Sequence, residues 1–263
     1  MVWNGRIGGR HRRAAALAVS GPNLLPDLRG IRAIACLAVW LVGGLALDAA
    51  YAQPPQPRSQ INSVFMSPDI EPWVARFERP GREIYDRRHE IVAATGVEAG
   101  MVVADIGAGT GLFTRLFAAR VGTSGKVYAV DISPAFVDNI RRNSREHGPT
   151  NVEGIVNSPR DVSLPPRSID VAFICDTYHH FEYPGAMMQS IRAALKPGGS
   201  VVVVDFRRIP GFSSSWVMGH VRADEAAVIG EIEASGFRLV ERRDFLRTNY
   251  FLRFVPVEGG SVR

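Results

Sequence analysis

From Pro72 to the C-terminus, short apolar runs alternate with turns and longer amphipathic runs. This alternation is typical of β-α units that build a parallel sheet. We predict strands at residues 101–105, 126–130, 151–156, 169–175, 200–205, 237–241 and 250–255. We predict helices at residues 79–95, 111–121, 134–147, 183–195 and 223–235. The pattern therefore indicates an α/β domain.

Turn and capping residues support several of these boundaries. Thr110 can cap the helix that follows it, and Ser133 precedes a proline in the first position of the next helix. The Gly-Gly pair 198–199 is expected to break the chain before the fifth strand, and Gly236 to close the last helix. Only the short link 242–249 joins the last two strands, so we expect an antiparallel hairpin at the sheet edge.

Composition and charge narrow the class of protein. The chain has 263 residues, of which 46% are hydrophobic, so it is expected to bury a sizeable core. The chain has 31 basic and 26 acidic residues. Residues 1–52 contain six of the basic residues and two of the acidic ones. The rest of the chain thus carries 25 basic and 24 acidic residues, and this balance predicts no nucleic-acid partner. The two cysteines, Cys36 and Cys175, are too few for a disulfide framework.

The N-terminal segment has the pattern of an export signal. Residues 33–47 carry no charge and would form a helix of about 22 Å, too short to span a bilayer comfortably. Arg29 and Arg32 precede this run, and Ala50-Tyr51-Ala52 follows it as an A-x-A cleavage site. We predict cleavage after Ala52 and export to the periplasm, with no stable membrane span afterwards. The alternative is an uncleaved leader that anchors the chain in the membrane.

These features divide the chain into three parts. Residues 1–52 form the leader, residues 53–70 a linker, and residues 71–263 the folded domain. The linker begins with the Pro/Gln-rich stretch 53–60, where each proline disfavours helix at its own position and at the preceding one.

The strongest candidate for a binding site is a glycine-rich turn after the first predicted strand. Asp105 ends that strand, and Gly107, Gly109 and Gly111 follow at alternate positions before a helix begins. Glycines let a ligand press against the backbone, and the free N–H groups of a helix's first turn favour a negative group. A dinucleotide-binding loop would need a third glycine where Leu112 stands, so a nicotinamide oxidoreductase fits poorly.

The next strand ends at Asp131, whose carboxylate can accept hydrogen bonds from both hydroxyls of a ribose. With the G-x-G-x-G turn, this acid resembles the class I S-adenosylmethionine-dependent methyltransferases. Four segments resemble that family's motifs in order: VVADIGAGTG, KVYAVDISP, SIDVAF and LKPGG. The resemblance covers residues 82–256. It implies a Rossmann-like α/β fold with a seven-stranded sheet in the order 3-2-1-4-5-7-6, the last strand antiparallel and helices on both faces.

The resemblance also implies S-adenosyl-L-methionine as the cofactor and gives roles to the residues around it. The glycines would admit its methionyl portion, Asp105 would meet the ammonium, Asp131 would hold the ribose, and Ile132 would lie against the adenine. Asp161 would accept from the adenine amino group, or would instead cap a helix. The expected cofactor-binding residues are Asp105, Gly107, Gly109, Gly111, Asp131, Ile132 and Asp161.

Candidate catalytic residues follow the fourth predicted strand. Methyl transfer from a sulfonium is an in-line displacement, and a base is needed only when the acceptor carries a proton. His179 is the candidate base, because imidazole titrates near neutral pH, and Asp176 could orient it or meet the cofactor's ammonium. Substrate contacts are expected from Arg82, Tyr85, His180, His220 and Arg222. For the arginines the alternative is a solvated face or a partner at a helix end.

The sequence thus predicts an S-adenosylmethionine-dependent methyltransferase acting on an unidentified small molecule. The alternative is an exported, non-catalytic module that keeps the nucleoside pocket and binds a ligand without transfer. No metal is expected, because His147, His180 and His220 are scattered and no short ligand pattern is present. An apolar acceptor pocket, or merely a packed lid, could be formed by Trp73, Phe77, Phe212 and Trp216.

Overall fold

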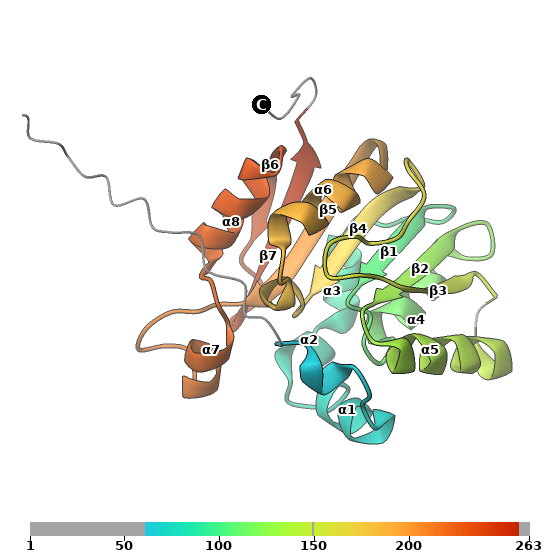
Figure 1. Cartoon of the computed structure of the whole chain (residues 1–263), viewed down its shortest axis with the longest axis horizontal. Helices are drawn as coiled ribbons and strands as arrows, with labels where there is room; N and C mark the ends of the chain where they lie inside the picture. The colour runs from blue at the N-terminus through green and yellow to red at the C-terminus, as the bar shows by residue number, and fades with distance from the viewer. Residues whose placement is uncertain (1–60, 149, 258–263) are drawn as a thin grey trace, which may run out of the picture. The chain divides into compact units, whose positions relative to one another are not determined.

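The computed structural model describes residues 61–148 and 150–257 (Figure 1). The predicted leader at residues 1–52 and its cleavage site lie outside the described residues, as do residues 53–60 of the predicted linker. Within the described ranges, no helix combines the length and the apolar character that a bilayer crossing requires.

A seven-stranded sheet runs through the described chain in the order β3-β2-β1-β4-β5-β7-β6. Its strands are β1 (Val102–Ile106), β2 (Lys126–Asp131), β3 (Val152–Val156), β4 (Ile169–Cys175), β5 (Leu195–Phe206), β6 (Phe237–Arg243) and β7 (Asn249–Pro256). Strands β1 to β5 pair in parallel, whereas β7 is antiparallel to both β5 and β6. The predicted strand order and the antiparallel hairpin at the edge are confirmed.

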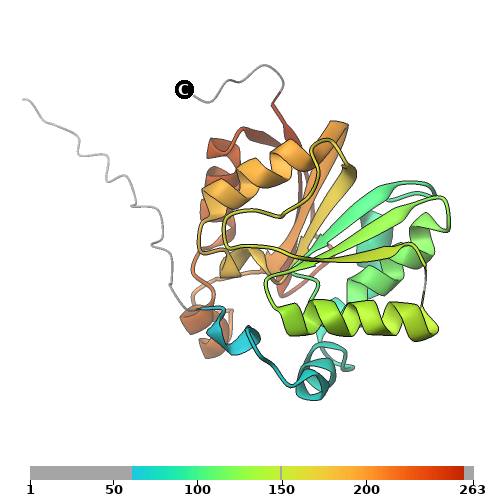
Figure 2. The ribbon, with the colours of Figure 1, turned by 45° about the vertical axis from the view of Figure 1, so that its right-hand side comes forward.

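Helices cover both faces of this sheet. The helical segments of the described residues are η1 (Ser63–Phe65), α1 (Ile70–Phe77), α2 (Glu83–Asp86), α3 (Arg88–Ala94), α4 (Leu112–Val121), α5 (Pro134–His147), η2 (Tyr178–His180), α6 (Pro184–Ala194), α7 (Ser215–His220) and α8 (Glu225–Ala234). Phe113 and Phe117 of α4 pack on one face, and Met188 of α6 and Ile232 of α8 pack on the other. Figure 2 shows α5 and α6 on opposite sides of the sheet.

The central strands are continuous apolar runs because both of their sides are covered. Residues 201–204 of β5 are four successive valines, and all four have no exposed surface. Such a run cannot face solvent on either side, so it fixes β5 in the middle of the sheet. Because these strands are buried and tightly packed, the strand ends that carry functional groups cannot shift independently of one another.

The predicted helix at residues 79–95 is wrong in its first part. Gly81 has a φ of +86°, which a right-handed helix excludes, so α2 begins only at Glu83. Arg87, with φ −100° and ψ 11°, then separates α2 from α3. Two short helices, α1 and α7, were not predicted. Both lie at the end of the sheet where the site is found.

Two further local predictions are wrong. The Thr110 side chain does not cap α4; its hydroxyl donates to Glu78 Oε1 at 2.7 Å, and Gly111 is the residue before the helix. The Gly-Gly pair 198–199 does not precede β5 but lies within it. There the pairing passes from Ile169↔Leu195 to Val171↔Ser200, so β5 accommodates extra residues as a bulge instead of breaking.

The cap of α5 is confirmed, and it supports a small stability prediction. Ser133 is fully buried, and its Oγ accepts a hydrogen bond from Phe136 N at 3.4 Å. Ser133→Ala should lower the free energy of unfolding by about 1 kcal/mol, measured by urea denaturation. Ser144→Ala, inside the same helix, is the matched control and should change it by less than about 0.5 kcal/mol. Equal losses in the two variants would contradict a capping role for Ser133.

Candidate active site at the carboxyl ends of the strands

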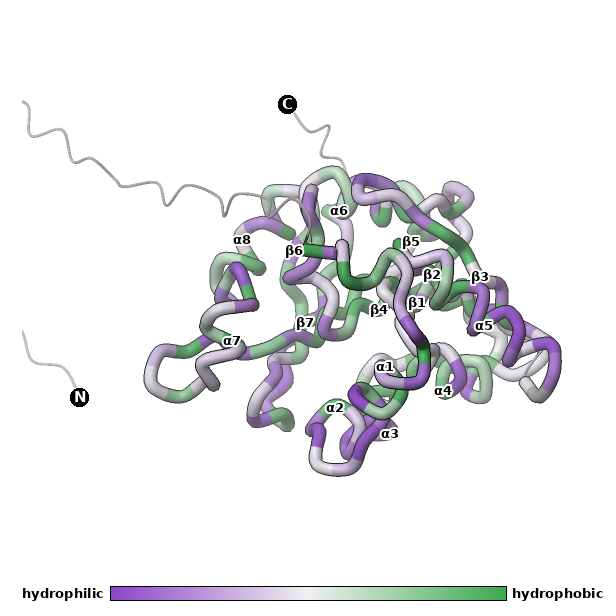
Figure 3. Tube along the Cα trace, turned by 60° about the horizontal axis from the view of Figure 1, so that its bottom comes forward, coloured by the Kyte–Doolittle hydropathy of each residue, from purple (hydrophilic) through white to green (hydrophobic). Residues whose placement is uncertain are grey.

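A cleft of about 580 Å³ opens where β1, β2, β4 and β5 end. Figure 3, turned so that the bottom of Figure 1 comes forward, shows α1, α2 and α7 at this end of the molecule. Trp73 of α1 and Trp216 of α7 are among the residues that line the cleft. In parallel sheets this edge is where ligands bind, because the loops that follow the strands converge there. The cleft is therefore the candidate active site.

The floor of the cleft is the glycine turn between β1 and α4. Gly107 N and Ala108 N both donate to Val130 O, at 2.8 and 3.0 Å, which ties the turn to the end of β2. Gly107 has a φ of +75°, and a Cβ built there would lie 2.7 Å from Thr177 Cβ and still closer to the outer atoms of that side chain. Only glycine fits at this position, because both the backbone conformation and the neighbouring side chain exclude a larger residue.

Two buried carboxyls stand beside this turn. Asp131 accepts hydrogen bonds from Gly109 N and Ser133 N, both at 2.8 Å, and Asp105 accepts one from Thr114 Oγ1 at 2.6 Å. Burial raises the pKa of Asp105 to about 7 and that of Asp131 to about 6. Both side chains line the cleft. A ligand that brings a positive charge or hydroxyl donors would stabilise the ionised carboxylates.

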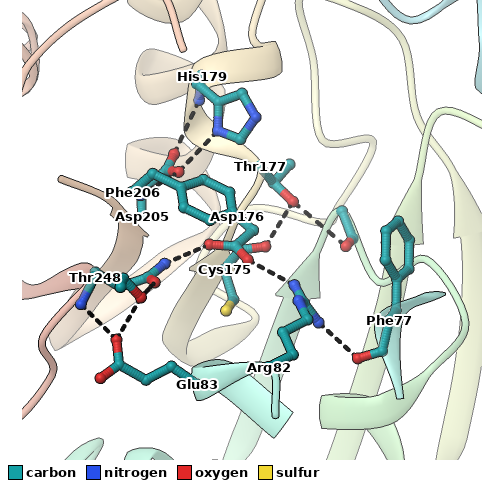
Figure 4. A network of polar contacts seen from close by, with 12 residues as sticks. Phe77, Arg82, Glu83, Cys175, Asp176, Thr177, His179, Asp205, Phe206 and Thr248 are labelled. Carbon is teal, nitrogen blue, oxygen red and sulfur yellow. Dashed lines mark hydrogen bonds and ion pairs between the residues drawn. The ribbon is translucent and has the colours of Figure 1, made fainter. Parts of the chain in front are cut away.

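Asp176, just after β4, is held in place by two neighbours (Figure 4). Its carboxylate accepts from Arg82 Nη2 and from Asn249 Nδ2, each at 2.6 Å. Burial raises the pKa of Asp176, and the Arg82 guanidinium opposes that effect. Arg82 also donates to Phe77 O at 2.7 Å, so one side chain joins α1 to the end of β4. This network places a carboxylate on the cleft wall.

His179 is oriented by Asp205 and not by Asp176. Its Nδ1 lies 2.7 Å from Asp205 Oδ1, and its backbone N donates to Asp205 Oδ2 at 3.0 Å. His179 is 4% exposed and Asp205 1%. An ionised carboxylate only accepts hydrogen bonds, so this contact favours the tautomer of the neutral imidazole that carries its proton on Nδ1 and keeps a lone pair on Nε2.

Two further imidazoles surround His179, and together they form the histidine cluster (His179, His180 and His220). His180 Nε2 lies 3.3 Å from His220 Nε2. The ring centroid of His179 lies 4.3 Å from that of His180 and 5.2 Å from that of His220. Burial, followed by the two neighbouring imidazoles, lowers the pKa of His180 to about 2. His180 is therefore neutral at physiological pH.

Aromatic side chains form the outer part of the cleft. Phe65 of η1 contacts Trp73 of α1, with ring centroids 4.9 Å apart, and Trp73 contacts Phe77 at 5.1 Å. On the other side, Trp216 of α7 stacks on His220 at 4.6 Å. These side chains line the cleft together with Arg76, whose guanidinium lies 5.3 Å from the Trp73 ring centroid and 5.9 Å from that of Trp216, so this part of the cleft is aromatic and suited to a flat ring.

Residues 62–65, inside the segment assigned to the linker, also contact the body. Asn62 Nδ2 donates to His180 O and to Glu182 Oε1, both at 3.1 Å. These two bonds hold η1 over the cleft. Asn62, Phe65 and Asp205 were missed as site residues. Of these three residues, only Asp205 could have been identified from the sequence, because it is an acid near the carboxyl end of a predicted strand adjacent to β4.

The structure brings most of the sequence-predicted residues together and places four elsewhere. The predicted residues that line the cleft are Arg82, Asp105, Gly107, Gly109, Asp131, Ile132, Asp176, His179, His180 and His220. Phe212, a candidate for the acceptor pocket, is 52% exposed and does not line the cleft. The four site residues placed elsewhere are Tyr85, Gly111, Asp161 and Arg222.

Each of these four residues has a structural role. Asp161 is exposed and accepts from Ser163 N at 2.6 Å within its own turn. Gly111 is the residue before α4, and a Cβ built there would lie 3.0 Å from Ile140 Cγ1. Arg222 forms two bonds of 2.6 Å with Glu231. The Arg88 guanidinium lies over the Tyr85 ring, with the Arg88 Cζ atom 4.2 Å from the ring centroid.

Known proteins resemble this chain in sequence and in fold. Residues 103–199 match the family described as "Methyltransferase domain". A "Ubiquinone/menaquinone biosynthesis C-methyltransferase UbiE" from Hydrogenovibrio crunogenus is 30% identical over 124 residues, 47% of this chain and 48% of that protein. The chain spans about half the length of the curated relatives that it matches.

Solved structures share the fold. A SAM-dependent methyltransferase from Aquifex aeolicus superposes with a TM-score of 0.65 at 22% identity, covering 73% of this chain and all of that one. The [4+2]-cyclase SpnF superposes with a TM-score of 0.54 at 21% identity, covering 64% of this chain and 63% of that one. The strand order, the glycine turn with Asp131 beside it, and the sequence match lead to one conclusion. Residues 103–199 match a methyltransferase domain, and the described chain has the fold of S-adenosylmethionine-dependent methyltransferases, for which S-adenosyl-L-methionine is the cofactor.

Proposed function

We propose that this chain transfers the methyl group of S-adenosylmethionine to a small, flat acceptor that carries an ionisable hydroxyl. The observation that supports this most is the continuity of one cleft, which joins the glycine turn and Asp131 to the histidine cluster and the aromatic opening. Bound cofactor supplies a methyl group on a positively charged sulfur. The residues of this chain would position the two reactants and assist removal of the acceptor's proton.

The cofactor side of the cleft is built from groups that suit its charges and hydroxyls. Gly107 and Gly109 leave the backbone open to close approach, and Asp131 is available to the ribose hydroxyls at the end of β2. Asp105 is buried, and its carboxylate accepts a hydrogen bond from the Thr114 hydroxyl; it would meet the ammonium directly or through water. Ile132 lines the same wall and would lie against the adenine.

The acceptor side is suited to a ring. Phe65, Trp73, Phe77 and Trp216 would hold its apolar body, and the histidine cluster would lie next to its hydroxyl. The relatives named as quinone-biosynthesis C-methyltransferases favour a hydroxylated aromatic or quinol ring, since they match this chain at 28–30% identity. An acceptor of this kind must lose a proton, which is the role we assign to the cluster.

The test is methyl transfer itself. The full-length chain is incubated with radiolabelled S-adenosylmethionine and a panel of hydroquinones and alkylphenols, with their fully methoxylated analogues and simple amines as controls. Label should appear on the hydroxylated rings and not on the controls. Label on amines alone would overturn the acceptor class, and cofactor binding without transfer to any compound would overturn the proposed activity.

Cofactor binding should depend on pH through the two buried carboxyls. The pKa of Asp105 lies near 7 and that of Asp131 near 6, so both are partly protonated at pH 6.5 in the unliganded chain. A positively charged ligand favours the ionised forms, so binding should release protons, and affinity should fall as pH falls from 8 to 5.

The released protons can be counted directly. Titration calorimetry at pH 6.5 in two buffers of different ionisation enthalpy should give different apparent heats. Asp105→Asn keeps an acceptor for the Thr114 hydroxyl but cannot titrate, so the difference between the two buffers should shrink. Heats that are identical in both buffers for the unaltered chain would contradict this linkage.

A further inference from the structure

Three imidazoles from two separate segments meet on the acceptor side of the cleft. His179 and His180 lie in η2, directly after β4, and His220 ends α7, forty residues further along. One ring nitrogen from each lies within 4.8 Å of the other two. All three side chains line the cleft. The fold thus creates a cluster that is not visible in the spacing of the sequence.

The distance between two of the three nitrogens equals the ligand spacing of a tetrahedral metal ion, and the third nitrogen lies within 4.8 Å of both. Zinc binds imidazole nitrogen at about 2.0–2.1 Å, so two ligands of a tetrahedral ion lie roughly 3.3 Å apart. The His180 Nε2 and His220 Nε2 atoms are 3.3 Å apart. The same distance allows a hydrogen bond in which one Nε2–H group donates to the other Nε2 atom, and a bound ion would take the place of that proton.

Asp205 prepares the third ligand. Its carboxylate receives the Nδ1 proton of His179 at 2.7 Å, which leaves the Nε2 lone pair of that ring free to bind. A carboxylate behind a histidine is the arrangement that fixes the tautomer and raises the basicity of metal ligands. His179 and Asp205 are almost fully buried, so their geometry is set by the core and not by solvent.

We propose that His179, His180 and His220 bind one divalent transition-metal ion through their Nε2 atoms, with the fourth position open to the cleft. Three imidazole ligands favour zinc, or a neighbouring ion such as cobalt, over magnesium or calcium, which prefer oxygen ligands. Three protein ligands with one open position are typical of catalytic zinc sites and not of structural ones. The ion would therefore serve the acceptor.

The role of the ion rests on the proposed function. An acceptor hydroxyl would take the fourth position through its oxygen. Its O–H bond would break with the electron pair remaining on oxygen, and the proton would leave to solvent. The positive ion would stabilise the negative charge left on that oxygen at neutral pH, so no histidine would need to act as a free base. The aromatic side chains at the opening would hold the rest of the ring.

Metal binding is tested on the full-length chain, purified without a polyhistidine tag and stripped with a chelator. Equilibrium dialysis should show one equivalent of Zn²⁺ bound, and Co²⁺ should give the intense visible absorption of a tetrahedral site. His220→Ala should weaken binding at least 100-fold. His89→Ala, an exposed histidine on α3, is the matched control and should bind as the unaltered chain does.

A second variant tests the carboxylate behind His179. Asp205→Asn should weaken Zn²⁺ binding about 10- to 100-fold, because the ring loses the partner that fixes its tautomer. Less than one equivalent in the unaltered chain, or unchanged affinity in His220→Ala, would overturn the proposal. S-adenosylmethionine binding by the unaltered chain is measured in parallel. Its absence would overturn the proposed function and leave the metal result standing.

Discussion

Replacing Asp131 with alanine should raise the dissociation constant for S-adenosylmethionine by at least about 100-fold. The carboxylate is only 6% exposed and stands on the cleft wall at the end of β2. Two charge-assisted hydrogen bonds to ribose hydroxyls, at a lower figure of ~1.5 kcal/mol each, sum to about 3 kcal/mol, and each 1.4 kcal/mol is tenfold in affinity. Titration calorimetry measures the change.

Asp161→Ala is the matched control for this variant. Asp161 is exposed and does not line the cleft, so its loss should leave cofactor affinity within twofold. Asp131 also accepts from Gly109 N and Ser133 N, so the unfolding curve of Asp131→Ala must show that the variant is folded at the titration temperature. A folded Asp131→Ala chain with unchanged affinity would contradict the assignment of the ribose site.

The second large effect is expected at the glycine turn. A methyl group at position 107 would overlap the Thr177 side chain, and the φ of +75° disfavours any residue with a Cβ. Overpacking costs about 1–3 kcal/mol, and the left-handed backbone adds roughly 1 kcal/mol. Gly107→Ala should therefore lose about 2–4 kcal/mol of folding free energy, measured by urea denaturation. The displaced turn should also bind cofactor at least tenfold more weakly.

A double variant separates the two causes. Thr177→Ala removes the atoms that the new methyl group would overlap most closely, so Gly107→Ala/Thr177→Ala should recover the steric part and retain the backbone part. Gly185→Ala is the control, because no atom lies within 4 Å of a Cβ built there. It should be neutral or slightly stabilising. No recovery in the double variant would show that the contact with Thr177 is not the cause.

The predictions that held for the fold depend on local patterns. The apolar runs of β4 and β5, the capping Ser133 and the glycine turn each express a preference that a few neighbouring residues impose on their own backbone. The strand order followed from the resemblance and agrees with these runs. Local reasoning failed where a distant contact competed, as at Thr110, whose hydroxyl bonds Glu78 instead of capping α4.

In the candidate site, too, some positions follow from local sequence patterns and others depend on contacts between distant residues. The position of Asp131 beside Gly107 and Gly109 follows from parallel strands whose carboxyl ends meet at one edge. The partner of His179 does not, because Asp205 is twenty-six residues away and reaches it only when β4 and β5 pair. Asp161 illustrates the opposite error. Its residue type and its place in the sequence suit a contact with the cofactor, but its carboxylate accepts a hydrogen bond from Ser163 N within its own turn.

The sequence by itself determined the α/β class, the helix cap at Ser133 and the glycine-rich turn after β1, because each rests on interactions between residues close in the chain. Only the tertiary structure decided that His220 meets His179 and His180, that η1 covers the cleft, and that Arg222 pairs with Glu231. Such contacts join elements packed from different parts of the chain, and their partners are selected by shape and burial across the whole core, which no local pattern encodes.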